Sequence, residues 1–162
     1  MVRLQEAILK VQTNQRQAPH RQRQRSNSNS RTRQTSITIT GDKLSLNYQE
    51  ITSLKIERMS SNSQMQETLN QFLKVKKLFL SHNSLETLDG IELFPNLTHL
   101  SISHNKLRNI EELSKVNATS LQCLAIKSNY FVERHPDHKT LLVNHFGNLR
   151  ELDSIQVGTD PS

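Results

Sequence analysis

The sequence has few of the residues on which several protein classes depend. Its 162 residues include one cysteine, four glycines, four prolines and no tryptophan. One cysteine excludes an internal disulfide framework, and four glycines leave little material for a glycine-rich phosphate-binding loop. No apolar run approaches the roughly 18 residues that a membrane helix needs, and no apolar secretory segment follows Met1. We therefore expect a soluble, intracellular protein with no membrane insertion.

Positive charge is concentrated near the N-terminus. Residues 1–40 hold eight Lys or Arg and one acid, whereas the rest of the chain holds thirteen basic and fourteen acidic residues. Residues 13–36 have too little apolar surface to offset the entropy of ordering. We predict that residues 1–40 form a basic, mostly disordered arm, with a short amphipathic helix over 2–12. The arginines that could contact an anionic surface are Arg16, Arg21, Arg23, Arg25, Arg31 and Arg33.

A repeat fills the rest of the chain. The segment 75–91, VKKLFLSHNSLETLDGI, aligns with 97–113, LTHLSISHNKLRNIEEL, and their asparagines lie 22 residues apart. Residues 121–129, LQCLAIKSN, repeat the first half of this pattern. Residues 44–54, LSLNYQEITSL, fit the same frame with Gln49 in place of asparagine. A fixed period of this length indicates a stack of similar units, each of which buries its apolar face against its neighbours.

This pattern resembles the short, 22-residue intracellular class of the leucine-rich repeat family. The resemblance implies an α/β fold, a short solenoid with a parallel β-sheet on its concave face. Pro136, Leu152, Asp153 and Val157 match the family's C-terminal cap. The segment SSNSQMQETLNQFLKVKK, between the first two repeats, is expected to form a helical insert. The expected leucine-rich repeat domain is 41–157, with repeats near 42–59, 75–96, 97–118 and 121–130, a cap at 131–157 and a tail at 158–162.

Three asparagines are expected to have a structural role. Asn83, Asn105 and Asn129 follow the strands of successive repeats. At such a bend an inward amide can satisfy buried backbone groups, which an apolar side chain could not do.

The concave face is the candidate binding surface. Phe79 stands out as an aromatic residue in a mostly small, polar set, and it is either a binding anchor or is covered by the arm or the insert helix. The candidate partner-binding residues are Lys77, Phe79, Ser81, His99, Ser101, Ser103, Cys123, Ala125 and Lys127.

Catalytic chemistry has little support in this sequence. His82 and His104 occupy equivalent places in neighbouring repeats and should stack about 5 Å apart. A histidine in this place is expected to be a polar bend residue, and Cys123 lies in no nucleophile motif. We predict no catalytic residue, no metal and no cofactor.

Two functions remain open. The favoured one is a non-catalytic scaffold whose concave face docks a protein. The resemblance extends to phosphatase regulators and to axonemal and centrosomal proteins, which implies a cytoplasmic place at the cytoskeleton, cilium or centrosome, with tubulin or axonemal and centrosomal proteins as partners. The alternative is a ribonucleoprotein component whose repeats hold an RNA-binding partner while the arginine-rich arm contacts RNA. We favour nucleic acid less, because the arm lacks stacking aromatics and the repeat region has balanced charge.

Overall fold

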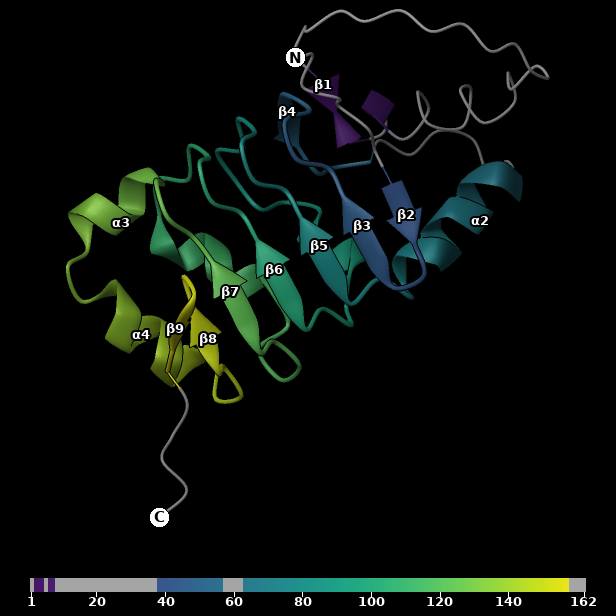
Figure 1. Cartoon of the computed structure of the whole chain (residues 1–162). Coiled ribbons are helices and arrows are strands. Elements are labelled where there is room, and N and C mark those ends of the chain that lie inside the picture. The colour runs from purple at the N-terminus through teal and green to yellow at the C-terminus, as the bar shows by residue number, and fades with distance from the viewer. Residues whose placement is uncertain (1, 5, 8–37, 57–62, 158–162) are drawn as a thin grey trace, which may run out of the picture.

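One seven-stranded sheet runs through the molecule (Figure 1). The computed structural model describes residues 2–4, 6–7, 38–56 and 63–157. The strand order is β2-β3-β5-β6-β7-β8-β9, in which β3 to β8 are parallel and the two outer strands are antiparallel to their neighbours. The strands are β2 (Thr38–Thr40), β3 (Lys43–Ser45), β5 (Lys77–Phe79), β6 (His99–Ser101), β7 (Cys123–Ala125), β8 (Glu151–Leu152) and β9 (Ile155–Gln156).

The parallel strands form because each repeat supplies a leucine that points inward between two outward residues. Leu44, Leu78, Leu100 and Leu124 lie in register, and each is buried. The residues on either side of each leucine are half-buried, except Lys43 on β3, which is exposed. Alternate side chains of a strand point to opposite faces, so this register separates an apolar inner face from a concave outer face.

Short helices return the chain between strands and close both ends (Figure 1). The 3-10 helices η1 (Ile91–Leu93) and η2 (Ile110–Lys115) lie within the second and third repeats, after their strands. The expected helical insert is α2 (Ser63–Phe72), whose Phe72 ring packs 4.7 Å from that of Phe94. At the other end, α3 (Tyr130–Arg134) and α4 (His138–His145) lead into β8. None of the helices in the described ranges has the length and apolar character to cross a bilayer.

A single apolar cluster links all the repeats. It extends from Leu44 in the first repeat to Leu152 in the cap and includes Phe94, Phe131 and Phe146. Burial of aliphatic side chains stabilises a fold by about 1.5–3 kcal/mol each before entropy is subtracted. Because each unit covers the apolar edge of the next, the cluster is shared by the stack and does not belong to any one repeat.

The first N-terminal residues pack against the repeat domain, whereas the sequence predicted a mostly disordered arm there. Strand β1 (Val2–Arg3) pairs in parallel with β4 (Ile51–Ser53), and Leu4 is completely buried. Residues 4, 6 and 7 are helical, so the helix expected over 2–12 begins after a short strand. The reason is tertiary: β4 offers an open strand edge and the core offers an apolar site, neither of which a local pattern shows.

The predicted boundary at residue 40 also shifts. Strand β2 lies inside the segment assigned to the arm and pairs with β3 as an antiparallel neighbour. The six arm arginines, from Arg16 to Arg33, lie outside the described residues.

Candidate functional site: the concave face

Two columns of outward side chains run across the concave sheet. The first column is Lys43, Lys77, His99, Cys123 and Glu151, one residue from each parallel strand. The second column is Ser45, Phe79, Ser101 and Ala125. Charge therefore changes across the face, from two lysines at the β3 end to a carboxylate at the β8 end.

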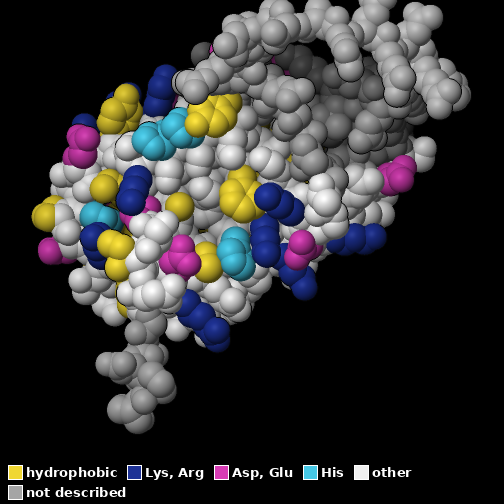
Figure 2. Space-filling view, viewed as in Figure 1, with side chains coloured by type: hydrophobic (Ala, Val, Ile, Leu, Met, Phe, Trp, Pro, Cys, Tyr) yellow, Lys and Arg dark blue, Asp and Glu magenta, His cyan; other side chains and the backbone are white. Residues whose placement is uncertain are grey.

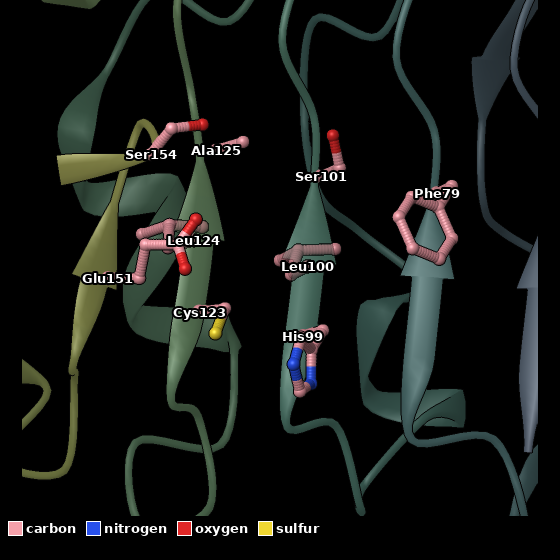
Figure 3. A pocket seen from close by; sticks show the side chains of 9 residues that line it. All are labelled: Phe79, His99, Leu100, Ser101, Cys123, Leu124, Ala125, Glu151 and Ser154. Atoms are coloured by element: carbon pink, nitrogen blue, oxygen red, sulfur yellow. The ribbon is translucent and has the colours of Figure 1, made fainter. Parts of the chain in front are cut away.

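A shallow pocket of about 170 Å³ opens at the middle of this face. Figure 3 shows Phe79 on β5 and Glu151 on β8 projecting from the same side of the sheet, with His99 and Cys123 on the strands between them. The residues that line the pocket are Phe79, His99, Leu100, Ser101, Cys123, Leu124, Ala125, Glu151 and Ser154. A hollow of this size admits one or two side chains of a partner, which is less than a small-molecule site usually offers.

Phe79 forms one wall of the pocket. Its side chain is half-buried, and the Lys43 ammonium lies 4.8 Å from the ring centroid. Because the sheet beside it bears Ser101 and Ala125, the ring stands above small neighbours. Aromatic rings in such settings are frequent anchors of protein interfaces.

Polar side chains on the same face are partly paired with one another. The hydroxyls of Ser81 and Ser101 share a hydrogen bond of 2.7 Å, and the Thr98 hydroxyl lies 2.9 Å from Nδ1 of His99. Ser103 and Lys127 lie on the chain just beyond β6 and β7, where their carbonyls accept hydrogen bonds from the backbone amides of His82 and His104 in the preceding repeats. These contacts hold the face in one arrangement before any partner arrives.

Cys123 is a poor nucleophile in this setting. Burial raises the pKa of its thiol, and the nearby Glu151 carboxylate raises it further, against weaker opposing effects of Lys77 and Arg150. The thiolate is the reactive form of cysteine, so this environment favours the unreactive thiol at neutral pH. Among the described residues, no group of three His, Cys, Asp or Glu side chains could hold a metal ion.

A ladder of amides fixes the bends that follow the strands. Nδ2 of Asn105 donates to the carbonyls of Leu80 and Ile102, both at 2.9 Å, while its Oδ1 accepts from the Leu85 amide at 3.1 Å. Each asparagine therefore joins its own repeat to the preceding one. Asn83 and Asn129 make the same set of contacts in their repeats.

The cap ends this ladder with an acid. Oδ1 of the buried Asp153 accepts from the Ile126 amide at 2.8 Å and from the Lys127 amide at 3.1 Å. Oδ1 of Asp153 thus holds amides of the preceding repeat, as Oδ1 of each asparagine does.

Rings also stack at the bends. The His82 and His104 rings lie 4.2 Å apart with an interplanar angle of 12°, which confirms the predicted stacking. Tyr48 adds a third ring, 4.3 Å from His82 and also at 12°. Figure 2 shows histidine side chains against a hydrophobic one at the rim above the sheet.

Two parts of this surface are missing from the sequence prediction. Glu151 and Ser154 line the pocket because the cap adds β8 and β9 to the sheet. The segment from Leu149 to Asp153 does carry a signal, since L-x-x-L-D is a shortened form of the strand pattern. Tyr48 takes the place of His82 in the frame of the first repeat, so the alignment of the repeats is the signal that could have added it to the histidine stack.

The comparisons with known proteins agree with this geometry. Residues 73–115 match the family model described as "Leucine Rich repeats (2 copies)". A chain in the crystal structure of the Drosophila melanogaster SNF/U2A′ complex superposes with a TM-score of 0.56 at 21% identity, over 78% of this chain and 82% of that one.

Two curated relatives are much longer than this chain. An acidic leucine-rich nuclear phosphoprotein 32-related protein of Plasmodium falciparum (isolate 3D7) is 26% identical over 117 residues, 71% of this chain. The mouse (Mus musculus) centrosomal protein of 72 kDa is 29% identical over 91 residues, 56% of this chain. The matches span only 34% and 14% of those two relatives. The repeat period, the parallel sheet and these matches together show that the chain contains leucine-rich repeats and has the fold of a leucine-rich repeat solenoid.

Proposed function

We propose that this chain is a non-catalytic scaffold that docks a protein on its concave face. Leucine-rich repeat proteins use such curved surfaces for binding. The observation that carries the proposal is the pocket beside Phe79, where an aromatic wall stands above small side chains. Five residues of the predicted set line this pocket, namely Phe79, His99, Ser101, Cys123 and Ala125. The proposed partner-facing surface also includes Lys77, Ser81, Ser103 and Lys127.

The proposed setting is a cytoskeletal one, at a centrosome, cilium or axoneme. The match to a centrosomal protein supports this setting. The six arm arginines would add a second contact, and the acidic tails of tubulin are a suitable surface for them. Such a contact should weaken with salt, because exposed charges are screened within about 10 Å at 0.1 M ionic strength.

Affinity capture with two aspartate variants tests the concave-face proposal. Phe79→Asp places a charge in the pocket, whereas Leu141→Asp places one at an exposed apolar site on α4. We expect wild type and Leu141→Asp to recover the same proteins by quantitative mass spectrometry, and Phe79→Asp to lose them. Recovery of the same proteins by all three would contradict concave docking.

The arm is tested separately. Replacing its six arginines by glutamine removes the charge without touching β1 or β2. We expect this variant to lose salt-sensitive co-sedimentation with microtubules in the presence of RNase. Unchanged co-sedimentation would remove tubulin from the proposal while leaving the concave face untested by that result.

A ribonucleoprotein component is the second candidate. The fold likeness to a chain of the SNF/U2A′ complex favours it. In that case the concave face would hold an RNA-binding protein. Wild type would recover this protein together with RNA that RNase removes, and the Phe79→Asp variant would recover neither.

A further inference from the structure

A column of residues at the rim of the sheet shares one unusual backbone conformation. Tyr48, His82, His104 and Ser128 have φ of 58°, 58°, 55° and 57°. Each of the first three donates its backbone N–H to the next repeat: Tyr48 to the Ser81 carbonyl, His82 to Ser103 and His104 to Lys127. The repeats therefore set the spacing of this column, and the side chains follow it.

Three of the four positions carry a ring, and the fourth does not. The Tyr48, His82 and His104 rings are stacked at 4.3 and 4.2 Å, each pair within 12° of parallel. Ser128 occupies the next place with the same backbone and only a hydroxymethyl group. His104 and Ser128 are both exposed. The place beside the His104 ring, above Ser128, is thus spaced for one more planar group.

Charge around this place is positive. Lys127 immediately precedes Ser128, and the Arg108 guanidinium lies 5.7 Å from the ring centroid of Tyr130, two residues after Ser128. Lys106 occupies in its repeat the position that Tyr130 occupies in the next. All three cations are exposed.

Charge is mixed toward the other end of the stack. Glu50 lies two residues after Tyr48, and Glu86, at the position that Arg108 takes one repeat later, lines a pocket with Arg3, Lys55 and Lys106. Beside Ser128, in contrast, Arg108 and Lys127 are both cations. A planar cation such as an arginine side chain would be repelled there, whereas a planar group on an anionic backbone would be attracted.

We propose that the place above Ser128 binds a base of a single-stranded nucleic acid, stacked on His104, with Lys106, Arg108 and Lys127 contacting the phosphates. Sequence-tolerant binding of single strands combines these two elements, aromatic faces for bases and cations for the backbone. The site lies on the rim of the sheet and is distinct from the pocket on the concave face.

Fluorescence anisotropy of the full chain with a labelled 12-nucleotide RNA of mixed sequence, at pH 8, tests the stacking contact. His104→Ala removes the ring, and Ser128→Tyr fills the place with the residue that position 48 already holds in the same conformation. Stacking on one side chain is worth about 1–3 kcal/mol per base, so each variant should weaken binding at least about fivefold. His145→Ala, on α4, should bind like wild type.

An abasic oligonucleotide of equal length separates stacking from charge. It keeps the phosphates and lacks the planar groups, so His104→Ala should leave its binding unchanged. Changing Lys106, Arg108 and Lys127 together to glutamine should instead reduce the salt dependence, by a slope of about 0.7 per lost phosphate contact.

Three results would overturn the site. One is wild-type affinity in both His104→Ala and Ser128→Tyr. Another is that His104→Ala weakens binding to the abasic oligonucleotide as much as binding to the RNA. The third is absence of binding to RNA and to DNA of the same sequence. Circular dichroism of each variant checks that the fold is kept, and Ser128→Tyr still decides the question if His104→Ala does not fold.

Discussion

At the scale of single residues, the asparagine ladder explains how so tight a bend can be buried. Each strand ends where the chain turns inward, and backbone groups at that turn have no strand partner. A buried backbone group without a partner costs about 1–3 kcal/mol. A carboxamide side chain carries two N–H donors and one carbonyl acceptor. It can therefore donate to backbone carbonyls of two repeats while it accepts from one backbone N–H.

Asn105→Leu should therefore destabilise the fold by about 1–3 kcal/mol, because it leaves the Leu80 and Ile102 carbonyls and the Leu85 amide without this partner. Urea unfolding followed by far-ultraviolet circular dichroism measures the change. Asn144→Leu, at an exposed position of α4, is the matched control and should stay within about 0.5 kcal/mol of wild type. Equal midpoints for the two variants would contradict the role of the ladder.

The thiol on the concave face gives a prediction in pH. Glu151 raises the pKa of Cys123, so Glu151→Gln should lower that pKa and increase the thiolate fraction below it. At pH 8 we expect faster alkylation by iodoacetamide, and a rate profile displaced to lower pH. Glu133→Gln, on α3, should leave the profile in place. A profile that moves to higher pH in Glu151→Gln would show that the two side chains do not interact as described.

At the scale of elements, the small sheet of β1 and β4 has an effect beyond its length. Strand β1 carries Leu4 into the core, where it is completely buried, although a long segment separates it from the repeats in sequence. The N-terminal residues thus cover the side of the first repeat. A repeat stack needs such a cover at each end, since the outermost apolar face has no neighbour.

Leu4→Ala should accordingly cost about 2–5 kcal/mol, the range for loss of a buried leucine. Thermal or urea unfolding provides the value. Leu141→Ala removes the same atoms from a side chain that is 50% exposed, and we expect a change below about 0.5 kcal/mol. Similar small effects of both variants would mean that the first residues do not contribute to the fold in solution.

The elements also show what could be predicted from the sequence. The strands β3, β5, β6 and β7 follow from the L-x-[LI] pattern, and their register follows from aligning the repeats on one another, because equivalent leucines must lie side by side. The concave columns could be named for the same reason. Strands β1, β8 and β9 have two residues each, too few for a period, and they form only because a neighbouring strand edge accepts them.

At the scale of the whole molecule, one continuous core predicts cooperative unfolding. Leucines from every repeat and from the cap belong to one buried cluster, so no part of the described ranges has a separate interior. The chain has two tyrosines and no tryptophan. Tyr48 lies in the first repeat and Tyr130 begins α3, which makes them reporters of the two ends.

Single-tyrosine variants test this cooperativity. Tyr130→Phe leaves Tyr48 as the fluorophore, and Tyr48→Phe leaves Tyr130. Within each variant we expect urea midpoints from fluorescence and from circular dichroism to coincide, as two-state behaviour requires. A fluorescence midpoint that precedes the circular dichroism midpoint in one variant would show that this end melts first and that the stack is not a single unit.

The antiparallel outer strands set a limit on how such a molecule can grow. β2 and β9 have three and two residues, so each presents few unpaired backbone groups to a second copy. The solenoid is terminated at both ends by its own chain, and fibre-like addition of further molecules is disfavoured. To widen the concave sheet by design, new repeats should therefore be inserted between β5 and β6. Repeats appended outside β2 or β9 would meet strands that are antiparallel to the rest of the sheet.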